Sequence, residues 1–315
     1  MIGFDIGGTK CAVTLGKKEG DNLIIKEKRT FSTDKRISPY ETIKKLCDIA
    51  CEMTDDIDVV GISCGGPLDS RNGVILSPPN LSGWDDIRIV EFVEKELKCK
   101  AFIQNDANAC AVAEWLYGAG RGSSNMVFLT FGTGLGAGLI LDGKLYTGTN
   151  DNAGEVGHIR LSEFGPVGYG KMGSFEGFCS GGGIGRLAAM MALEKLQIGK
   201  KVSYCRNISA VDSITAKDVA DAANAGNEDA LEVYRKCGEK LGMGLSVIID
   251  ILNPEIIVIG SVYTRCENLL KETMMEFIRK EALVPALEVC EIRPAYLGEN
   301  IGDYAALSVA AMNMK

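Results

Sequence analysis

The sequence lacks the features that would place it outside a reducing compartment. It has eleven cysteines but no CxxC pair, and no framework typical of a small disulfide-linked domain, so we expect free thiols that are mostly buried. No signal-peptide pattern precedes the first apolar strand, and no apolar run reaches the roughly 18 residues of a membrane helix. We therefore expect a cytoplasmic protein with no membrane partner.

Positive charge is also scarce. Lysine and arginine together number 34 against 42 aspartates and glutamates, which gives a net charge of −8. This balance disfavours nucleic acid or an anionic membrane as the main partner. The 315 residues, 46% of them hydrophobic and 24% charged, have the composition of a folded globular protein, and the length favours two domains.

Two common nucleotide motifs are absent. There is no GxxxxGK[ST] loop, and the glycine-rich segments do not fit the dinucleotide fingerprint because each returns into a strand instead of opening a helix. What the chain has instead is a strand, a glycine turn and a second strand, once from Ile2 (IGFDIGGTKCAVTLG) and again from Asn125 (NMVFLTFGTGLGAGLILDG). The segments match when Asp5 is placed over Thr130. We infer one duplicated unit per domain, with the boundary at GAGRGSS, residues 118–124.

Hydrophobic periodicity predicts an α/β protein around these two segments. Strands are predicted for NLIIKEKRTF, DVVGISCGG, AFIQND, EIIVIG and EIRPAYLG. Helices are predicted for SPYETIKKLCDIACEMT with Ser38 as its cap and Pro39 in its first turn, for DIRIVEFVEKEL, ANACAVAEWLYG and YAALSVAAMNM, and for residues 184–196, 216–225 and 229–251.

The glycine turns suggest anion binding. Successive backbone amides in such a turn can point at one phosphate, and glycine lets the phosphate approach the main chain. A tight hairpin without a ligand is the alternative for either turn alone, but two related turns could hold the terminal phosphates of a nucleotide between domains. Asp5 beside such a turn would repel phosphate unless a cation lay between them, so we expect it to position Mg²⁺ directly or through water. The alternative is an aspartate that caps the turn.

Four segments in this order, DIGGTK, FGTGLGAG, NDANACAVAEW and EVGH, resemble the ROK family of sugar kinases and repressors over essentially the whole chain. The resemblance implies the two-lobed, actin-, Hsp70- and hexokinase-like ATPase fold with duplicated phosphate-binding hairpins. It places residues 1–118 and the C-terminal helix, about 302–315, in one α/β lobe and residues 119–301 in the other, with the active site in the cleft between them.

The resemblance also assigns roles to residues. Asp106 matches the catalytic base, which suits a sugar hydroxyl because a positioned carboxylate can accept its proton during phosphoryl transfer. A helix N-cap is the other interpretation of Asp106, and the two roles are compatible. The positions that match sugar-binding residues are Gly65 with Gly66 at the pocket wall, Asn80, Asn105, Asp106, Glu155, His158 and Glu176.

On the nucleotide side the implied cofactors are ATP and Mg²⁺. Asp5 is the expected metal residue, and Gly260 lies at the adenosine end, although a glycine that merely ends a strand is the alternative there. The positions expected to cradle phosphates and metal are Asp5, Gly7, Gly8, Thr9, Lys10, Gly132, Thr133 and Gly134. Ser261 stands where many members have a second glycine.

One segment departs from the family pattern. Typical members have a zinc site after the EVGH histidine, with cysteines spaced CxCGxxGC, and here those three positions hold Val167, Tyr169 and Ser174. None supplies a thiolate, so we expect no zinc. His158, the only histidine in the chain, is then available for the sugar alone.

These observations predict an ATP- and Mg²⁺-dependent kinase acting on a hexose or N-acetylhexosamine, at the 6-hydroxyl, with Asp106 as general base. Two alternatives stay open: a sugar sensor of the same family and an actin-like ATPase without a sugar substrate. The first phosphate strand begins at Met1, which leaves no room for a preceding helix-turn-helix and adds to the expectation of no nucleic-acid partner. Relatives imply a homodimer, and the identity of the sugar cannot be read from the sequence.

Overall fold

The computed structural model describes residues 1–314. The chain divides into two compact units. Unit 1 contains Met1–Ser124, Gly138–Ala153 and the chain from Tyr296 onward, and unit 2 contains Asn125–Ala137 and Gly154–Ala295. Within the described residues, no helix combines the length and apolar character needed to span a membrane. The division into an N-terminal and a C-terminal lobe with an active site between them stays a prediction.

Unit 1 is built on a five-stranded mixed sheet of order β3-β2-β1-β4-β7. β1 pairs antiparallel with β2 and parallel with β4, and β4 pairs parallel with β7. Its strands are β1 (Ile2–Ile6), β2 (Lys10–Glu19), β3 (Asn22–Ser32), β4 (Val59–Cys64) and β7 (Lys100–Asn105), and a small hairpin joins β5 (Leu68–Asp69) to β6 (Val74–Ile75).

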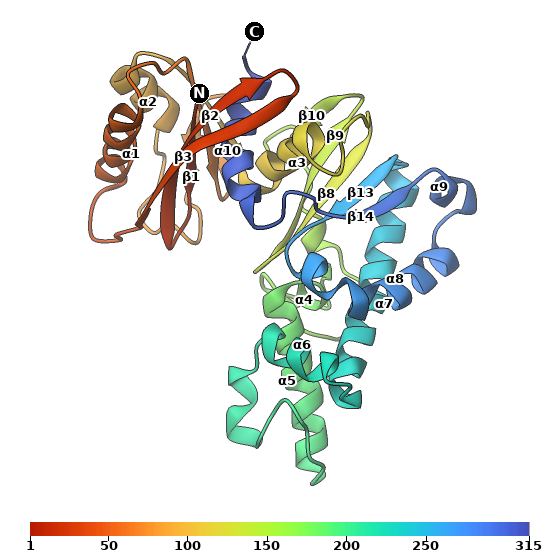
Figure 1. Cartoon of the computed structure of the whole chain (residues 1–315). Coiled ribbons are helices and arrows are strands. Elements are labelled where there is room, and N and C mark those ends of the chain that lie inside the picture. Colours follow the sequence, from red (N-terminus) through yellow and green to blue (C-terminus); the bar gives the residue numbers. More distant parts are fainter. Residues whose placement is uncertain (315) are drawn as a thin grey trace. The chain divides into compact units, whose positions relative to one another are not determined.

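Helices cover both faces of this sheet. α1 (Pro39–Met53) and α2 (Ile89–Leu97) lie on one side of β1 and β3, and α10 (Ile301–Met312) lies on the other (Figure 1). α1 begins with a capping box between Ser38 and Glu41. α10 approaches so closely that a Cβ on Gly61 would lie 2.0 Å from the carbonyl oxygen of Ala306. Glycine is therefore required there.

Glu114 fixes the end of α3 (Asp106–Tyr117). Its side chain is fully buried, and its carboxylate accepts hydrogen bonds from the amides of Ala119 (2.7 Å), Tyr296 (3.2 Å) and Leu297 (2.9 Å). Three charge-assisted bonds satisfy a carboxylate that would otherwise be costly to bury. Glu114 thereby ties the segment after α3 to the segment that leads into α10.

A second five-stranded sheet, which contains strands of unit 2, has the order β10-β9-β8-β13-β14. Its strands are β8 (Met126–Phe131), β9 (Leu135–Leu141), β10 (Lys144–Tyr146), β13 (Ile256–Ile259) and β14 (Glu291–Pro294). β13 pairs parallel with β8 and with β14, and β9 carries the chain from unit 2 into unit 1. In each sheet the first strand in the chain lies at the centre, the second and third strands follow on one side, and the fourth and fifth follow on the other. This shared order confirms the predicted duplication.

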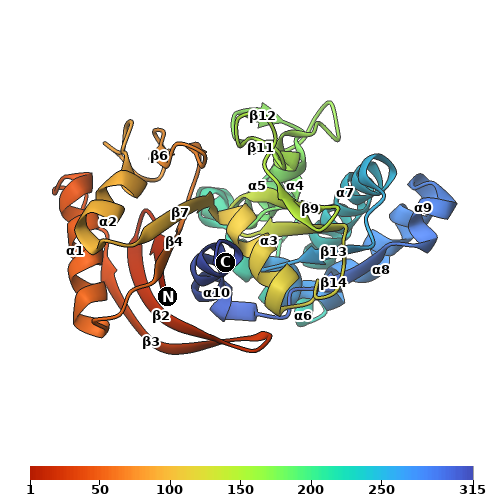
Figure 2. The same cartoon turned by 90° about the horizontal axis from the view of Figure 1, so that it is seen from above.

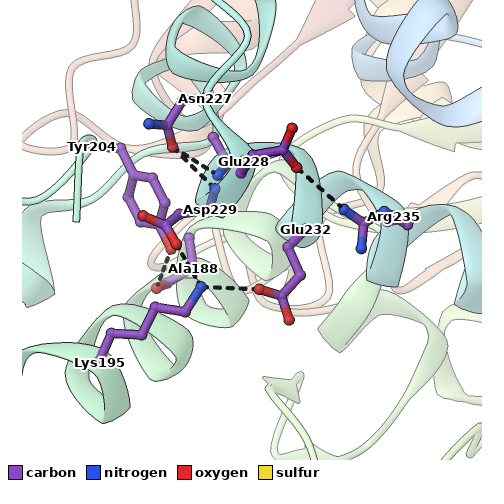
Figure 3. A network of polar contacts seen from close by, with 9 residues as sticks. Ala188, Lys195, Tyr204, Asn227, Glu228, Asp229, Glu232 and Arg235 are labelled. Carbon is purple, nitrogen blue, oxygen red and sulfur yellow. Dashed lines mark hydrogen bonds and ion pairs between the residues drawn. The ribbon is translucent and has the colours of Figure 1, made fainter. Parts of the chain in front are cut away.

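The helices of unit 2 are α4 (Phe175–Phe178), α5 (Gly181–Gln197), α6 (Ala216–Asn224), α7 (Glu228–Leu252), α8 (Val262–Glu281) and α9 (Val284–Glu288). Lys195 links α5 to α7, because its ammonium lies 2.6 Å from Asp229 Oδ1 and 2.9 Å from Glu232 Oε2 (Figure 3). The bonds to Asp229 and Glu232 raise the pKa of Lys195 to about 12. The hairpin of β11 (Val167–Gly168) and β12 (Lys171–Met172) lies beside α4 (Figure 2).

The predicted strands and helices are confirmed, with ends that shift by a few residues. The sequence analysis missed α8. Its buried residues Cys266, Leu270, Met274 and Ile278 recur every four positions, a spacing that indicates one apolar helix face. The helix is interrupted at Cys266, whose φ of −124° and ψ of 22° are not helical.

Candidate functional site

In unit 1 the candidate residues follow the ends of three neighbouring parallel strands. In the sheet register Ile6 lies opposite Cys64, and Cys64 lies opposite Asn105. Gly7, Gly65 and Asp106 therefore leave the sheet at the same edge. The carboxyl ends of parallel strands are where open α/β sheets bind ligands.

The first glycine turn is closed by its own backbone and held by the end of β3. Gly7 N–H donates to the carbonyl of Lys10 at 3.1 Å, and the Thr33 hydroxyl donates to the carbonyl of Gly7 at 2.6 Å. The amides of Gly8 and Thr9 donate to no residue within 1–314. Two consecutive free amides in a glycine turn are what an anion needs.

Asp5 is a partly buried carboxylate that accepts no hydrogen bond from the described residues. Burial, together with the charges of Asp303 and Asp106, raises its pKa to about 6 against the opposing effect of Lys28 and Lys10. Asp303 is itself buried at the start of α10, with Lys28 Nζ 2.6 Å from its Oδ1. The ion pair compensates the negative charge of Asp303, whereas Asp5 has no direct cation partner among the described residues.

Asn105 and Asp106 have different roles at the start of α3. Asn105 is the N-cap of α3, because its Oδ1 accepts from Asn108 N–H at 2.7 Å. Asp106 is the first helical residue, and its Oδ1 accepts from Ala107 N–H at 2.8 Å. The interpretation of Asp106 as the N-cap is therefore wrong. Desolvation by the surrounding atoms raises the pKa of Asp106, although the residue is exposed to solvent.

The segment with Asn80 packs directly on the first glycine turn. A Cβ on Gly8 would lie 2.4 Å from the carbonyl oxygen of Asn80, so only glycine fits. Asn80 is exposed. Apart from the chain neighbours of Gly65, no atom in the described part of the chain lies within 4 Å of the Cβ position of Gly65. The structure thus places a predicted sugar residue beside the predicted phosphate turn.

The second glycine turn has its own contacts in unit 2. Gly132 N–H donates to the carbonyl of Gly134 at 3.1 Å, and Gly181 N–H donates to the carbonyl of Gly132 at 2.8 Å. The amides of Thr133 and Gly134 donate to none of the residues that the structure describes. At the matched position of Asp5, the Thr130 hydroxyl accepts from Gly136 N–H at 3.1 Å.

Three predicted sugar residues gather beside this turn. Glu176, on α4, accepts from Leu135 N–H through Oε2 at 3.0 Å, which leaves Oε1 for a ligand. Gly157, between Glu155 and His158, packs against both segments: its Cβ would lie 2.2 Å from the carbonyl oxygen of Leu135 and 3.2 Å from Glu176 Cβ. The close approach brings the 155–158 segment to Glu176.

His158 is held by the segment that departs from the family pattern. The ring of Tyr169 meets the imidazole edge-on, with centroids 5.2 Å apart, and Lys171 Nζ donates to the His158 carbonyl at 2.6 Å. Tyr169 and Gly170 both have positive φ (43° and 74°), as a two-residue hairpin turn between β11 and β12 requires. Ser174, at a cysteine position of the family pattern, is the buried N-cap of α4.

Gly260 follows β13 and donates its N–H to the carbonyl of Leu129 at 3.0 Å, so it leaves the second sheet at the same edge as the Gly132 turn. Two further residues lie nearby: Ser261, which the sequence analysis noted only as a departure from the family pattern, and Arg186, which it did not name. Ser261 Oγ lies 3.8 Å from the Cβ position of Gly132, and Arg186 Nη1 lies 3.1 Å from that of Gly182. The exposed Arg186 forms no ion pair within residues 1–314. The sequence signal for Arg186 is an arginine one turn after the glycine-rich start of a helix.

The residues of unit 1 fit Mg²⁺. Asp5 is a carboxylate without a hydrogen-bond donor, among like charges and beside free amides, and Mg²⁺ binds through one or two carboxylates together with water and phosphate oxygens. Over residues 1–314, no group of three or more histidine, cysteine or acidic side chains is arranged to hold a metal, so Mg²⁺ would depend on the bound phosphates for its other ligands. The expectation that zinc is absent stays a prediction.

The chain is similar to proteins of one family. The ROK family model matches residues 1–312. A glucokinase of Halalkalibacterium halodurans is 31% identical over 96% of this chain and 92% of its own length. A xylose repressor of Caldicellulosiruptor bescii is 29% identical over 78% of this chain and 60% of its own length. A crystal structure of a ROK family glucokinase from Streptomyces griseus with glucose and AMPPNP superimposes with a TM-score of 0.76 at 27% identity, covering 99% of both chains.

Proposed function

We propose that this chain, which belongs to the ROK family, is an ATP-dependent kinase that phosphorylates a hydroxyl of a hexose or N-acetylhexosamine, with the 6-hydroxyl as the acceptor. The glucokinase relative and the glucokinase structure with bound glucose and AMPPNP support this class of reaction. The observation that carries the proposal lies in unit 1. Three adjacent strand ends bring a turn with two free amides, an unpartnered Asp5 and Asp106 to one edge of a sheet.

Asp106 acts as the general base in this proposal. Its raised pKa makes the carboxylate a better proton acceptor than an aspartate with the ordinary pKa, and a base with a pKa closer to neutrality is more effective in proton transfer. The hydrogen bond from Ala107 N–H occupies Oδ1, which leaves Oδ2 to accept the proton of the sugar hydroxyl. Asn105 orients the sugar through its amide Nδ2, because its Oδ1 is already used as the helix cap.

Asp5 would hold Mg²⁺, directly or through water, and the bound metal would supply positive charge against that of the phosphates. The free amides of Gly8 and Thr9, and of Thr133 and Gly134, bind phosphate oxygens. Lys10, exposed at the start of β2, adds positive charge to the first turn. Asn80, Glu155, His158 and Glu176 bind sugar hydroxyls through donors and acceptors that suit a polyol. Gly65 leaves open space at the wall of the sugar pocket.

The test is ADP release from ATP and Mg²⁺ with a panel of sugars: glucose, mannose, allose, fructose, N-acetylglucosamine and N-acetylmannosamine. We expect one sugar to stimulate ADP release and to become a sugar phosphate. A parallel preparation of Asp106→Asn controls for contaminating kinases. ADP release that no sugar alters would favour an actin-like ATPase and would count against the proposal.

A sugar-responsive regulator is the second candidate, because a xylose repressor is among the relatives. The same panel separates it from the kinase. A regulator would bind a sugar in calorimetry but would release no ADP in its presence. The proposed homodimer is tested separately, by light scattering of the purified chain.

A further inference from the structure

Ser261 has a backbone conformation that serine rarely adopts. It lies between β13 and α8 with φ 54° and ψ −110°. This combination resembles the first central residue of a type II′ turn, where glycine is preferred because a Cβ is strained. Lys98 and Asn253 also have positive φ, but they lie in the ordinary left-handed region as helix C-caps. Ser261 is therefore a strained position of a different kind.

The hydroxyl of Ser261 does not explain the strain through the protein's own contacts. A serine at a helix N-cap usually accepts a hydrogen bond from the first turn, yet Ser261 makes no such bond in α8. Ser261 is exposed, and its Oγ has no hydrogen-bond partner among residues 1–314. Glycine would relieve the backbone at this position without the loss of any hydrogen bond that the structure contains.

The free hydroxyl lies at the second glycine turn. Apart from Gly132 and its chain neighbours, Ser261 Oγ is the only atom of the described residues within 4 Å of the Cβ position of Gly132, at 3.8 Å. Gly132 begins the turn in which the amides of Thr133 and Gly134 have no acceptor. An unused O–H donor and two unused N–H donors therefore occur around one glycine turn, all within unit 2.

We propose that Ser261 is a nucleotide-binding residue whose hydroxyl donates a hydrogen bond to a phosphate oxygen of the nucleotide held at the Gly132–Gly134 turn. This inference rests on the proposed use of ATP. It explains why a strained serine stands where glycine would be relaxed: the backbone strain is retained because the hydroxyl contributes to ligand binding. Strained residues of this kind occur most often at ligand sites.

The experiment compares Ser261→Ala and Ser261→Gly with the unchanged protein. Calorimetry measures the affinity for ADP and for AMPPNP with Mg²⁺, and differential scanning measures the melting temperature without ligand. Both variants lose the hydroxyl, so both should bind ADP about tenfold more weakly, as expected for one hydrogen bond to a charged group. Only Ser261→Gly also relieves the backbone, and its melting temperature should rise by about 2 °C.

Asn253→Gly is the matched control. Asn253 lies in the same unit with positive φ, but it precedes β13, whereas Ser261 follows it. This variant should become more stable without a change in ADP affinity. A weaker affinity in Asn253→Gly equal to that in Ser261→Gly would attribute the effect to backbone flexibility and overturn the inference.

Adenosine serves as the probe without phosphate. The loss of affinity in Ser261→Ala should appear with ADP and AMPPNP and be absent with adenosine; an equal loss with adenosine would overturn the phosphate contact. Unchanged ADP affinity in both Ser261 variants overturns the inference while the kinase proposal stands. If the unchanged protein binds neither ADP nor AMPPNP, the proposed use of ATP fails, and this inference fails with it.

Discussion

The two glycine turns share a backbone and differ in their side chains. Each turn follows the first strand of a sheet with the same strand order, and each presents two consecutive amides without an acceptor among residues 1–314. The first turn closes between Gly7 and Lys10, whereas the second closes between Gly132 and Gly134. The arrangement that suits a phosphate has thus been kept in both copies.

The two copies differ in the strand that leads into the glycine turn. Asp5 carries an unpartnered carboxylate near Asp106 and Asp303, while Thr130, at the matched position, uses its hydroxyl to bind the amide of Gly136. One residue is available to a ligand, and the other stabilises its own hairpin. In the proposed function, anion binding therefore belongs to the duplicated backbone, whereas the proposed metal residue and the proposed base belong to unit 1.

The largest expected effect tests that assignment. Asp106→Asn keeps the size of the side chain and removes the base, so kcat should fall about 10²- to 10⁴-fold. Glu176→Gln is the matched change beside the second turn, and it should act mainly on the KM for sugar. Steady-state kinetics with the best sugar of the panel measures both. A kcat for Asp106→Asn within tenfold of the unchanged protein would remove Asp106 from the role of base.

Matched glycine substitutions compare the rigidity of the two turns. Gly8→Ala would place its Cβ 2.4 Å from a backbone carbonyl oxygen of Asn80, whereas Gly134→Ala would meet Glu176 Oε2 at 2.7 Å. A backbone atom cannot move as cheaply as the end of a side chain. We expect Gly8→Ala to lower the free energy of unfolding by about 3 kcal/mol and Gly134→Ala by about 1 kcal/mol. Urea denaturation measures both, and equal losses would contradict the difference.

The pKa of Asp5 predicts a pH dependence that the second turn lacks. The folded-state value of about 6 lies above the ordinary 3.8, so the folded protein holds this proton more tightly than the unfolded chain. Stability from this group is fully present below pH 3.8 and is lost as pH rises through 6. In EDTA, the free energy of unfolding of the unchanged protein, relative to that of Asp5→Asn, should fall by about 2 kcal/mol between pH 4 and pH 7, after allowance for partial exposure. A pH-independent difference in melting temperature between the two would refute the shift.

The smallest effect concerns Thr130. Thr130→Val keeps the shape of the side chain but leaves Gly136 N–H without its 3.1 Å partner, which should cost about 1 kcal/mol of stability. Because the hydroxyl serves the hairpin, kcat should stay within about twofold of the unchanged protein. A tenfold loss of kcat without a change in stability would show that Thr130 serves the ligand as Asp5 does.

Much of the fold followed from local signals. Ser38 and Pro39 marked the start of α1, and the repeated strand and glycine pattern indicated two copies of one unit, because these signals depend on residues close together in the chain. The Lys28–Asp303 ion pair could not be found in this way, since 275 positions separate its partners. The contact between Gly8 and Asn80 depends likewise on tertiary packing.

The candidate site was likewise predicted in part from the sequence, and in part it required the structure. The family motifs supplied Asp106, Glu176 and the glycines, but they could not show that Asn105 caps α3 or that Glu176 binds the amide of Leu135. Ser261 was visible as a departure from the family pattern. Its strain and its unused hydroxyl required backbone angles, which no single sequence reports.

The close fit of α10 against Gly61 bears on the order in which the protein folds during synthesis. Met1, Leu23 and Val59 on the first sheet are buried together with Leu307 and Ala310 of α10, so one face of that sheet stays uncovered until the last helix has left the ribosome. Unit 2 needs no residue beyond Ala295. The unit that begins translation is therefore the one that is completed last, and a chain that stops before residue 301 would expose an apolar sheet face to aggregation.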